Sequence, residues 1–199
     1  MPKETFRRLK DEKKQRIFQA AVQEFSAYRY SEASINRIVK ASKIPWGSFY
    51  QYFNDKADLF LYVMERIMTE IADTGQKNLP DHGDYDTLTQ FANRLASTIE
   101  LNNSKPEYVR IAMMQSKEDD PVVKQFYELQ DGHKQMVIDL FERDKQRGLI
   151  RDDVDATDII EMVYLLSKEV FYTIGSDGNA YQKKMEAFLK IIQEGIRRL

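Results

Sequence analysis

The chain has 199 residues, of which 42% are hydrophobic and 31% charged, a composition typical of a globular protein that buries a substantial core. It contains no cysteine, which excludes disulfides, thiolate nucleophiles and Cys-ligated metals. No run approaches the roughly 18 consecutive apolar residues of a membrane span, and no apolar stretch follows the basic N-terminus as in a secretory signal. We therefore expect a cytoplasmic protein with no membrane partner.

The net charge of −2 conceals an asymmetry along the chain. Residues 1–56 hold 12 Lys and Arg against 6 Asp and Glu, a net charge of +6, whereas the remaining residues hold 18 against 26, a net charge of −8. A basic first quarter on an acidic body is typical of a nucleic-acid-binding end joined to a domain with another task. Taken alone, the asymmetry could also arise by chance.

The first part of the chain predicts a charged arm and then a helix. Residues 1–12 are charged and we expect them to be mobile, although such an arm can also reach a DNA minor groove. Residues 13–28 predict a helix, because apolar residues recur every three or four positions. Those apolar residues lie on two adjacent rows: Ile17, Ala21 and Phe25, then Phe18 and Val22.

The stretch from Ser34 to Leu59 predicts two short helices joined by a tight turn, followed by the start of a longer helix. Ser34 suits an N-cap because its hydroxyl can accept a backbone N–H bond. Apolar spacing continues to Val39, and Pro45, which lacks an N–H, suits the start of the second helix. Asp55 begins a carboxylate version of the capping box for the third helix. This pattern predicts a helix-turn-helix, whose second helix can enter a DNA major groove.

This stretch, SINRIVKASKIPWGSFYQYFNDKADL, resembles the DNA-binding region of the tetracycline-repressor-like (TetR) regulators, which show a pattern of the kind I-A-x-x-A-G-V-S-x-G-T-L-Y-x-Y-F-x-[SN]-K-x-x-L. The positions that match it or substitute conservatively are Ile38, Ile44, Gly47, Ser48, Phe49, Tyr50, Tyr52, Phe53, Lys56 and Leu59. The departures are Val39 and Ser42 where Ala is usual, Lys43 at the Gly of the turn, and Pro45 at the usual Ser cap. A turn that needs a positive φ would strain Lys43.

The candidate DNA-binding residues lie on the two short helices. If Phe49 and Phe53 face inward, the second helix leaves these residues for DNA: Trp46, Gly47, Ser48, Tyr50, Gln51 and Tyr52. Gln51 can pair bidentately with adenine. We also expect at least one of Tyr50 and Tyr52 to pack in the core, and Trp46 could equally be a packing residue at the helix start.

Two further groups complete the candidate DNA site. The resemblance implies that Tyr50 and Lys56 bind backbone phosphate, Lys56 from the N-terminus of the third helix of this stretch. The start of its first helix is likewise placed for phosphate or base edges, through Ser34, Asn36 and Arg37.

The remaining pattern predicts helices over about 56–75, 88–102, 104–116, 121–147 and 155–174, with Gly148 as a helix stop, and a last helix after the turn at 176–179 that carries apolar residues from Met185 to Ile196. No alternating strand pattern interrupts them. We therefore expect an all-α fold of about nine helices. Residues 1–55 would form the helix-turn-helix DNA-binding domain, and residues 56–199 a helical domain for ligand binding and dimerisation.

The resemblance implies a homodimer formed through the last two helices, and a small-molecule ligand of unknown identity held in the second domain. Methionine and aromatic side chains suit a sizeable, largely apolar ligand. The candidates are Phe91, Tyr108, Met113, Met114, Phe126, Tyr127, Met136 and Tyr164. Any one of them could equally be an ordinary core residue.

A two-fold dimer would place two recognition helices about one helical turn of double-stranded DNA apart, and so prefer a palindromic operator. Ligand binding would favour a spacing that no longer fits the grooves, which is release of a repressor by population shift.

Nothing in the chain argues for an enzyme or a cofactor. His82 and His133 have no metal-ligand spacing, and no nucleophile elbow, phosphate loop or dinucleotide fingerprint occurs. Two alternatives stay open beside the repressor. One is a ligand-requiring activator, and the other is a helical adaptor that binds another protein and has no salt-sensitive DNA affinity.

Overall fold

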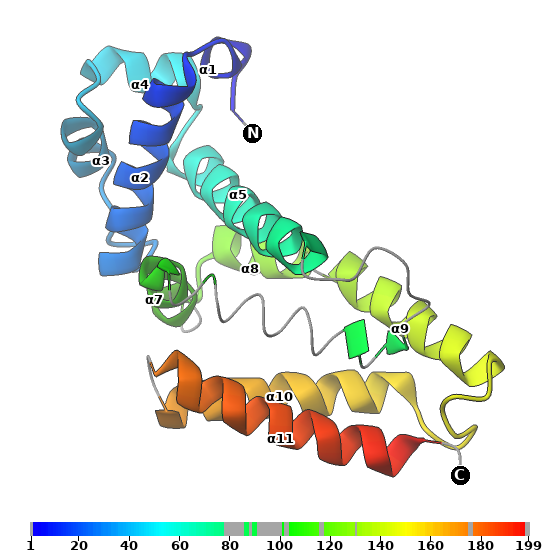
Figure 1. Ribbon diagram of the computed structural model, residues 1–199. Helices are drawn as coiled ribbons and strands as arrows, with labels where there is room; N and C mark the ends of the chain where they lie inside the picture. Colours follow the sequence, from blue (N-terminus) through cyan, green and yellow to red (C-terminus); the bar gives the residue numbers. More distant parts are fainter. Residues whose placement is uncertain are drawn as a thin grey trace. The chain divides into compact units, whose positions relative to one another are not determined.

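The computed structural model describes residues 2–77, 86–87, 89–90, 101, 104–115, 118–129, 131–174 and 177–197 (Figure 1). Its helices are α1 (Glu4–Arg7), α2 (Asp11–Ala27), α3 (Ile35–Ser42), α4 (Trp46–Tyr52), α5 (Lys56–Lys77), α7 (Pro106–Gln115), α8 (Pro121–Leu129), α9 (Asp131–Gln146), α10 (Ala156–Ile174) and α11 (Gly178–Ile196). The expected all-α class is confirmed. None of the helices in these ranges is long and apolar enough to cross a membrane.

The chain forms two compact units, each built from two stretches of sequence. The first unit comprises residues 1–70 and 105–129, and the second comprises residues 71–104 and 130–199. This division by packing differs from the expected functional boundary after residue 55, because α7 and α8 fold with the N-terminal helices. The functional boundary itself stays a prediction.

The core of the first unit is built around α2, which packs against α3 and α7. The side chains that face this core are almost fully excluded from water, and burying each Val, Leu, Ile or Phe among them contributes about 1.5–3 kcal/mol. They include Ile17, Phe18, Ala21, Val22 and Phe25 of α2, Ile38 and Val39 of α3, and Leu59, Phe60 and Val63 of α5. The two apolar rows predicted for the first helix are therefore its core face.

A buried glutamine joins α7 to the C-terminal end of α2. Gln115, 1% exposed, donates from Nε2 to the carbonyl oxygens of Phe25 (3.0 Å) and Tyr28 (3.1 Å). Its Oε1 accepts the backbone N–H of Tyr30 at 2.8 Å. One side chain thus satisfies three backbone groups where the chain leaves α2, and the two buried ones, the Phe25 carbonyl and the Tyr30 N–H, would otherwise lack these partners.

Two expectations are wrong, one about the first residues of the chain and one about the helix over 121–147. The mobile arm expected over residues 1–12 is not found in its described part, because residues 4–7 form α1 and Phe6 is 3% exposed. The single helix expected over 121–147 is two helices, α8 and α9, which belong to different compact units. The sequence Asp131-Gly132 at the start of α9 combines two poor helix formers, which favours a new helix start there. The helix expected from Leu88 to near Asn102 lies largely outside the described residues.

In the second unit, α9, α10 and α11 pack around one apolar cluster. Its buried members are Phe141, Ile150, Ala156, Ile159, Val163, Leu189, Ile192 and Ile196. Gly148 follows the end of α9 and has φ 71°. Its N–H donates to the Lys145 carbonyl, and the N–H of Leu149 donates to the Asp144 carbonyl, which confirms the predicted helix stop. An isolated antiparallel bridge then pairs Ile150 with Arg197.

Candidate nucleic-acid interface

The turn between α3 and α4 has the geometry of a left-handed helix cap. Lys43 adopts φ 54° and ψ 42°, and its N–H bonds to the carbonyl of Lys40. The N–H of Ile44 reaches back to the carbonyl of Val39, and both of those side chains are buried. This is a Schellman motif, which usually has glycine at the position of Lys43. The expected positive φ is therefore present, and a lysine occupies it.

Helix α4 has one buried and one exposed side. The buried side consists of Phe49 and Tyr52, continued by Phe53 after the helix end. The exposed side consists of Trp46, Gly47, Tyr50 and Gln51, with Ser48 half-buried. The helix is seven residues long and follows a short turn, which is the arrangement of a recognition helix that presents its outer side to a major groove.

Two large aromatic rings lie together on the exposed side of α4. Trp46 and Tyr50 are each 47% exposed, and their ring centroids are 5.9 Å apart in an edge-to-face arrangement. Large rings normally contribute to the core, so an exposed pair one turn apart indicates a contact surface for another molecule. Rings of this kind can pack on sugars, thymine methyl groups and base edges.

The two tyrosines of α4 have different environments. Tyr50 is exposed, whereas Tyr52 is 5% exposed and its ring packs edge-on against Phe6. The Tyr52 hydroxyl accepts a hydrogen bond from Lys13 Nζ at 2.9 Å. The expectation that at least one tyrosine packs in the core is confirmed, and Tyr52 has little surface left for a direct base contact.

At the start of α3, Arg37 is held by a buried carboxylate. Its Nε donates to Glu24 Oε1 at 2.8 Å, and its guanidinium lies 4.1 Å from the centroid of the Tyr28 ring. Hydrogen bonding to Glu24 raises the pKa of Arg37. Ser34 takes the N-cap position, but its hydroxyl makes no capping bond, and its N–H instead donates to Glu24 at 2.7 Å. Glu24 thus fixes α3 on α2, and Asn36 beside it is exposed.

Lys56 also has internal partners. Its ammonium donates to the carbonyl oxygens of Tyr30 (2.6 Å), Ser31 (3.3 Å) and Ala33 (3.1 Å). An ammonium has three N–H donors, so in this conformation all three are engaged. Lys56 therefore ties the loop between α2 and α3 to the first turn of α5, an arrangement different from the phosphate contact that the sequence predicts.

The N-terminus of α5 carries the expected carboxylate cap. Asp55 Oδ1 accepts the N–H of Asp58 at 2.9 Å, and Asp58 Oδ2 accepts the N–H of Asn54 at 3.0 Å. The cap therefore fixes the point where the chain passes from the helix-turn-helix into α5.

Sequence reasoning missed the residues before α2. Lys3, Thr5 and Phe6 all contact the end of α4 or the residues after it. The available signal was Phe6 itself, a large aromatic residue inside an otherwise charged stretch.

Some of the predicted ligand residues lie in the described part of the structure and others do not. Phe91 and the side chains of Met113, Tyr127, Met136 and Tyr164 lie outside the described part of the structure. Tyr108 and Phe126 are buried and Met114 is half-buried. The Tyr108 hydroxyl donates to Glu70 Oε2 at 2.7 Å, and burial followed by this bond raises the pKa of Tyr108.

Tyr108 borders a surface groove of about 290 Å³ between α2 and α7. Most of its walls are polar, whereas the sequence predicts an apolar ligand site. The lining residues are Gln15, Phe18, Gln19, Val22, Gln23, Ser26, Lys105, Glu107, Tyr108 and Arg110.

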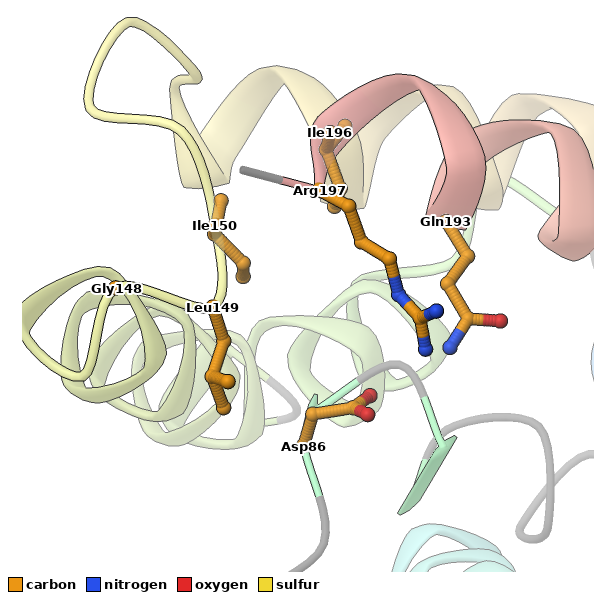
Figure 2. Close-up of a pocket in the computed structure, with 7 residues that line it drawn as sticks. All are labelled: Asp86, Gly148, Leu149, Ile150, Gln193, Ile196 and Arg197. Atoms are coloured by element: carbon orange, nitrogen blue, oxygen red, sulfur yellow. The ribbon is translucent and has the colours of Figure 1, made fainter. Parts of the chain in front are cut away.

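The second unit has a smaller cavity of about 180 Å³ where α9 and α11 end (Figure 2). Asp86, Gln193 and Arg197 extend polar groups toward the same space, and Leu149, Ile150 and Ile196 supply apolar wall. Pockets for drug-sized ligands are typically about 300–1,000 Å³, so this cavity suits at most a small polar molecule. Among the residues that the structure describes, no group of His, Asp and Glu could hold a metal ion.

A model of bacterial regulatory proteins of the tetR family matches residues 17–63, which cover most of α2, the helix-turn-helix and the first turns of α5. An HTH-type transcriptional regulator of Staphylococcus aureus is 32% identical over 136 residues, 58% of this chain and 73% of that protein. An HTH-type transcriptional repressor of Streptomyces coelicolor is 24% identical over 154 residues, 77% of this chain and 76% of that protein.

Solved structures share the fold over almost the whole chain. A TetR family transcriptional regulator from Chloroflexus aurantiacus has a TM-score of 0.70 and 23% identity, with 100% of both chains covered. FadR from Bacillus subtilis in complex with stearoyl-CoA has a TM-score of 0.76 and 15% identity, with 92% of this chain and 99% of that chain covered.

Proposed function

Because the chain belongs to the tetR family of bacterial regulatory proteins, which are DNA-binding transcriptional regulators, we propose that it is a repressor of this kind. It binds a palindromic operator as a homodimer and leaves it when a small, largely apolar ligand binds. Its place of action is the cytoplasm, where bacterial DNA lies. The Streptomyces coelicolor relative, named as a repressor, supports this direction of regulation.

The observation that carries the DNA contact is the exposed side of α4. Trp46 and Tyr50 present aromatic surface, and the exposed side chain of Gln51 can pair with adenine. Gly47, which has no side chain, lets the α4 backbone approach the DNA closely. The net charge of +6 over residues 1–56 attracts the phosphate backbone. Arg37 and Lys56 then act mainly through the internal contacts that hold α3 and α5 in place.

The dimer proposal is supported by apolar side chains that the second unit leaves in water. Leu165 of α10 is 63% exposed and Ile191 of α11 is 66% exposed, and Met162 lies one turn from Leu165 on α10. Each helix already buries another side in the cluster of the second unit. A second apolar side on both of the last two helices is suited to a partner copy.

The proposed ligand can be sought among compounds that a protein of the same fold binds. The fold shared with FadR, whose structure holds stearoyl-CoA, makes long-chain acyl compounds a reasonable first set to test. The measurement is the loss of operator binding on titration, with a shorter acyl chain as the matched control.

The test of the DNA proposal is selection of binding sites from random duplex DNA with the full-length protein at near-physiological salt. We expect a palindromic site, and we expect Trp46→Ala and Tyr50→Ala each to lower the affinity for this site about tenfold. Leu149→Ala, which truncates a comparably exposed residue of the second unit, serves as control and should leave affinity unchanged. Selection of no site by the folded protein would favour the adaptor, whereas selection only in the presence of a ligand would favour the activator.

A further inference from the structure

The first residues of the chain fold onto the C-terminal end of the recognition helix. The backbone N–H of Lys3 donates to the carbonyl of Tyr52 at 2.8 Å, and Lys3 Nζ donates to the carbonyl of Tyr50 at 2.9 Å. The Thr5 hydroxyl donates to the carbonyl of Gln51. These carbonyls belong to the last three residues of α4, which a helix leaves without intrahelical partners.

Phe6 anchors this segment in the core of the first unit. Its side chain is 3% exposed, and its ring centroid lies 4.9 Å from that of Phe53 and 5.0 Å from that of Tyr62. The Tyr52 ring lies against it at 6.2 Å. Phe6 therefore packs between the end of α4 and α5, and holds residues 3–5 against the α4 carbonyls.

Helix α4 depends on such external contacts. It has seven residues, whereas isolated helices shorter than about 12 residues are marginal in water. Its N-cap is Pro45, which makes no side-chain capping bond. The orientation of α4 is thus set by its buried side and by whatever holds its two ends, and the N-terminal segment holds one of them.

We propose that Lys3, Thr5 and Phe6 are positioning residues that fix the recognition helix before it meets DNA. The segment acts on DNA through α4 and not as a free arm in the minor groove. This proposal rests on the proposed function, and it predicts that uncharged changes in the segment reduce specific binding. A phosphate-binding arm would instead respond to changes of charge.

Thr5 allows a test with a matched pair of variants that differ in a single hydroxyl group. Thr5→Val removes the hydroxyl that bonds to the Gln51 carbonyl, whereas Thr5→Ser keeps it. Phe6→Ala removes the anchor, and Phe6→Leu keeps an apolar side chain of similar volume. We expect Thr5→Val to weaken binding to the selected operator several-fold and Phe6→Ala at least tenfold. Thr5→Ser should bind like wild type, and Phe6→Leu should retain most of the affinity.

Two readouts separate positioning from other roles. The salt dependence of affinity should keep its wild-type slope in Thr5→Val and Phe6→Ala, because neither changes the number of phosphate contacts. Trp46, the single tryptophan, lies on α4 and reports its mobility by time-resolved fluorescence anisotropy. We expect a larger fast component in both variants without DNA, while circular dichroism shows the helical content retained.

The proposal is overturned if Thr5→Val binds DNA like wild type, or if Trp46 anisotropy is unchanged in Thr5→Val. It is also overturned if the salt slope falls, which would make the segment a phosphate contact. Failure of the proposed function has a different signature, since wild type itself would then select no DNA site. The anisotropy comparison would still decide whether the segment restrains α4.

Discussion

At the residue scale, Gly47 occupies a position where nothing inside the protein requires glycine. A Cβ built there meets no atom within 4 Å, and the residue is helical and exposed. Glycine in a helix costs about 0.5–1 kcal/mol relative to alanine. A residue that lowers stability without an internal reason is consistent with close approach of DNA to the α4 backbone.

We therefore expect Gly47→Ala to raise the free energy of unfolding by about 0.5–1 kcal/mol and to weaken operator binding at least tenfold. Denaturant unfolding and a binding titration measure the two effects. Gly195→Ala, at another open helical glycine, is the control for the stability gain. Unchanged DNA affinity in Gly47→Ala would place this part of α4 away from the DNA.

Lys43 presents the opposite case, a side chain where glycine would be easier. A left-handed conformation costs a non-glycine residue about 1–2 kcal/mol, so Lys43→Gly should stabilise the protein by about 1 kcal/mol. Lys40→Gly places the same change in the right-handed part of α3 and should destabilise by a similar amount. Thermal unfolding of both variants measures the contrast, and equal effects would show that the turn conformation is not the cause.

Lys56 shows what the chain alone does not reveal at this scale. Its place in the motif suggests phosphate, but the carbonyls that bind it come from residues 30–33, whose approach depends on tertiary packing. Lys56→Ala should lower the free energy of unfolding by about 0.5–1.5 kcal/mol, because it removes the hydrogen bonds to the partly buried carbonyls of Tyr30 and Ala33. The salt slope of DNA binding should stay at its wild-type value. A slope reduced by about one would instead identify a phosphate contact.

At the element scale, the helices with strong apolar spacing were predictable and their ends were less so. The rows on α2, the turn at Lys43 and the stop at Gly148 follow from local rules, because spacing and backbone conformation are properties of a few neighbouring residues. The break between α8 and α9 and the folding of α1 could not be derived in this way. Phe6 becomes buried only because Phe53 and Tyr62 meet it from distant positions.

Asp144 connects α9 to Thr87, a residue of the second unit that is distant in the sequence. Its side chain is fully buried and accepts from the N–H and hydroxyl of Thr87 and, at 2.9 Å, from Arg143. Burial disfavours its charge, but these hydrogen bonds, those of Thr87 first, outweigh burial and lower the pKa of Asp144. The charged carboxylate therefore stabilises the fold above the ordinary aspartate pKa of about 4, and this contribution is lost as pH falls through the lowered value.

We expect Asp144→Asn to lower the free energy of unfolding by about 2 kcal/mol at pH 7 and to reduce the further loss between pH 5 and 3. Urea midpoints across that range measure both. Asp139→Asn, at an exposed position of α9, should keep the wild-type profile. An unchanged pH profile in Asp144→Asn would assign the acid sensitivity to other carboxylates.

At the scale of the whole molecule, DNA recognition and assembly should be linked, because a palindrome is bound by two recognition helices. Ile191→Asp places a charge on the exposed apolar side of α11 and should convert the proposed dimer to monomer. We expect operator affinity to fall at least a hundredfold while helical content is retained. Sedimentation velocity and DNA titration measure this, with Asn179→Asp as the control of equal charge. If Ile191→Asp stays dimeric, the dimer interface does not include this side of α11.

The bonds of Gln115 have a consequence for protein engineering. Because α7 closes over α2 and satisfies its C-terminal backbone groups, the part of the chain that carries the helix-turn-helix is not one continuous segment. Transplanting the operator preference of this protein onto a relative would therefore require two inserts, residues 1–70 and 105–129. A chimera that exchanged only the first would leave Phe25, Tyr28 and Tyr30 facing a foreign helix.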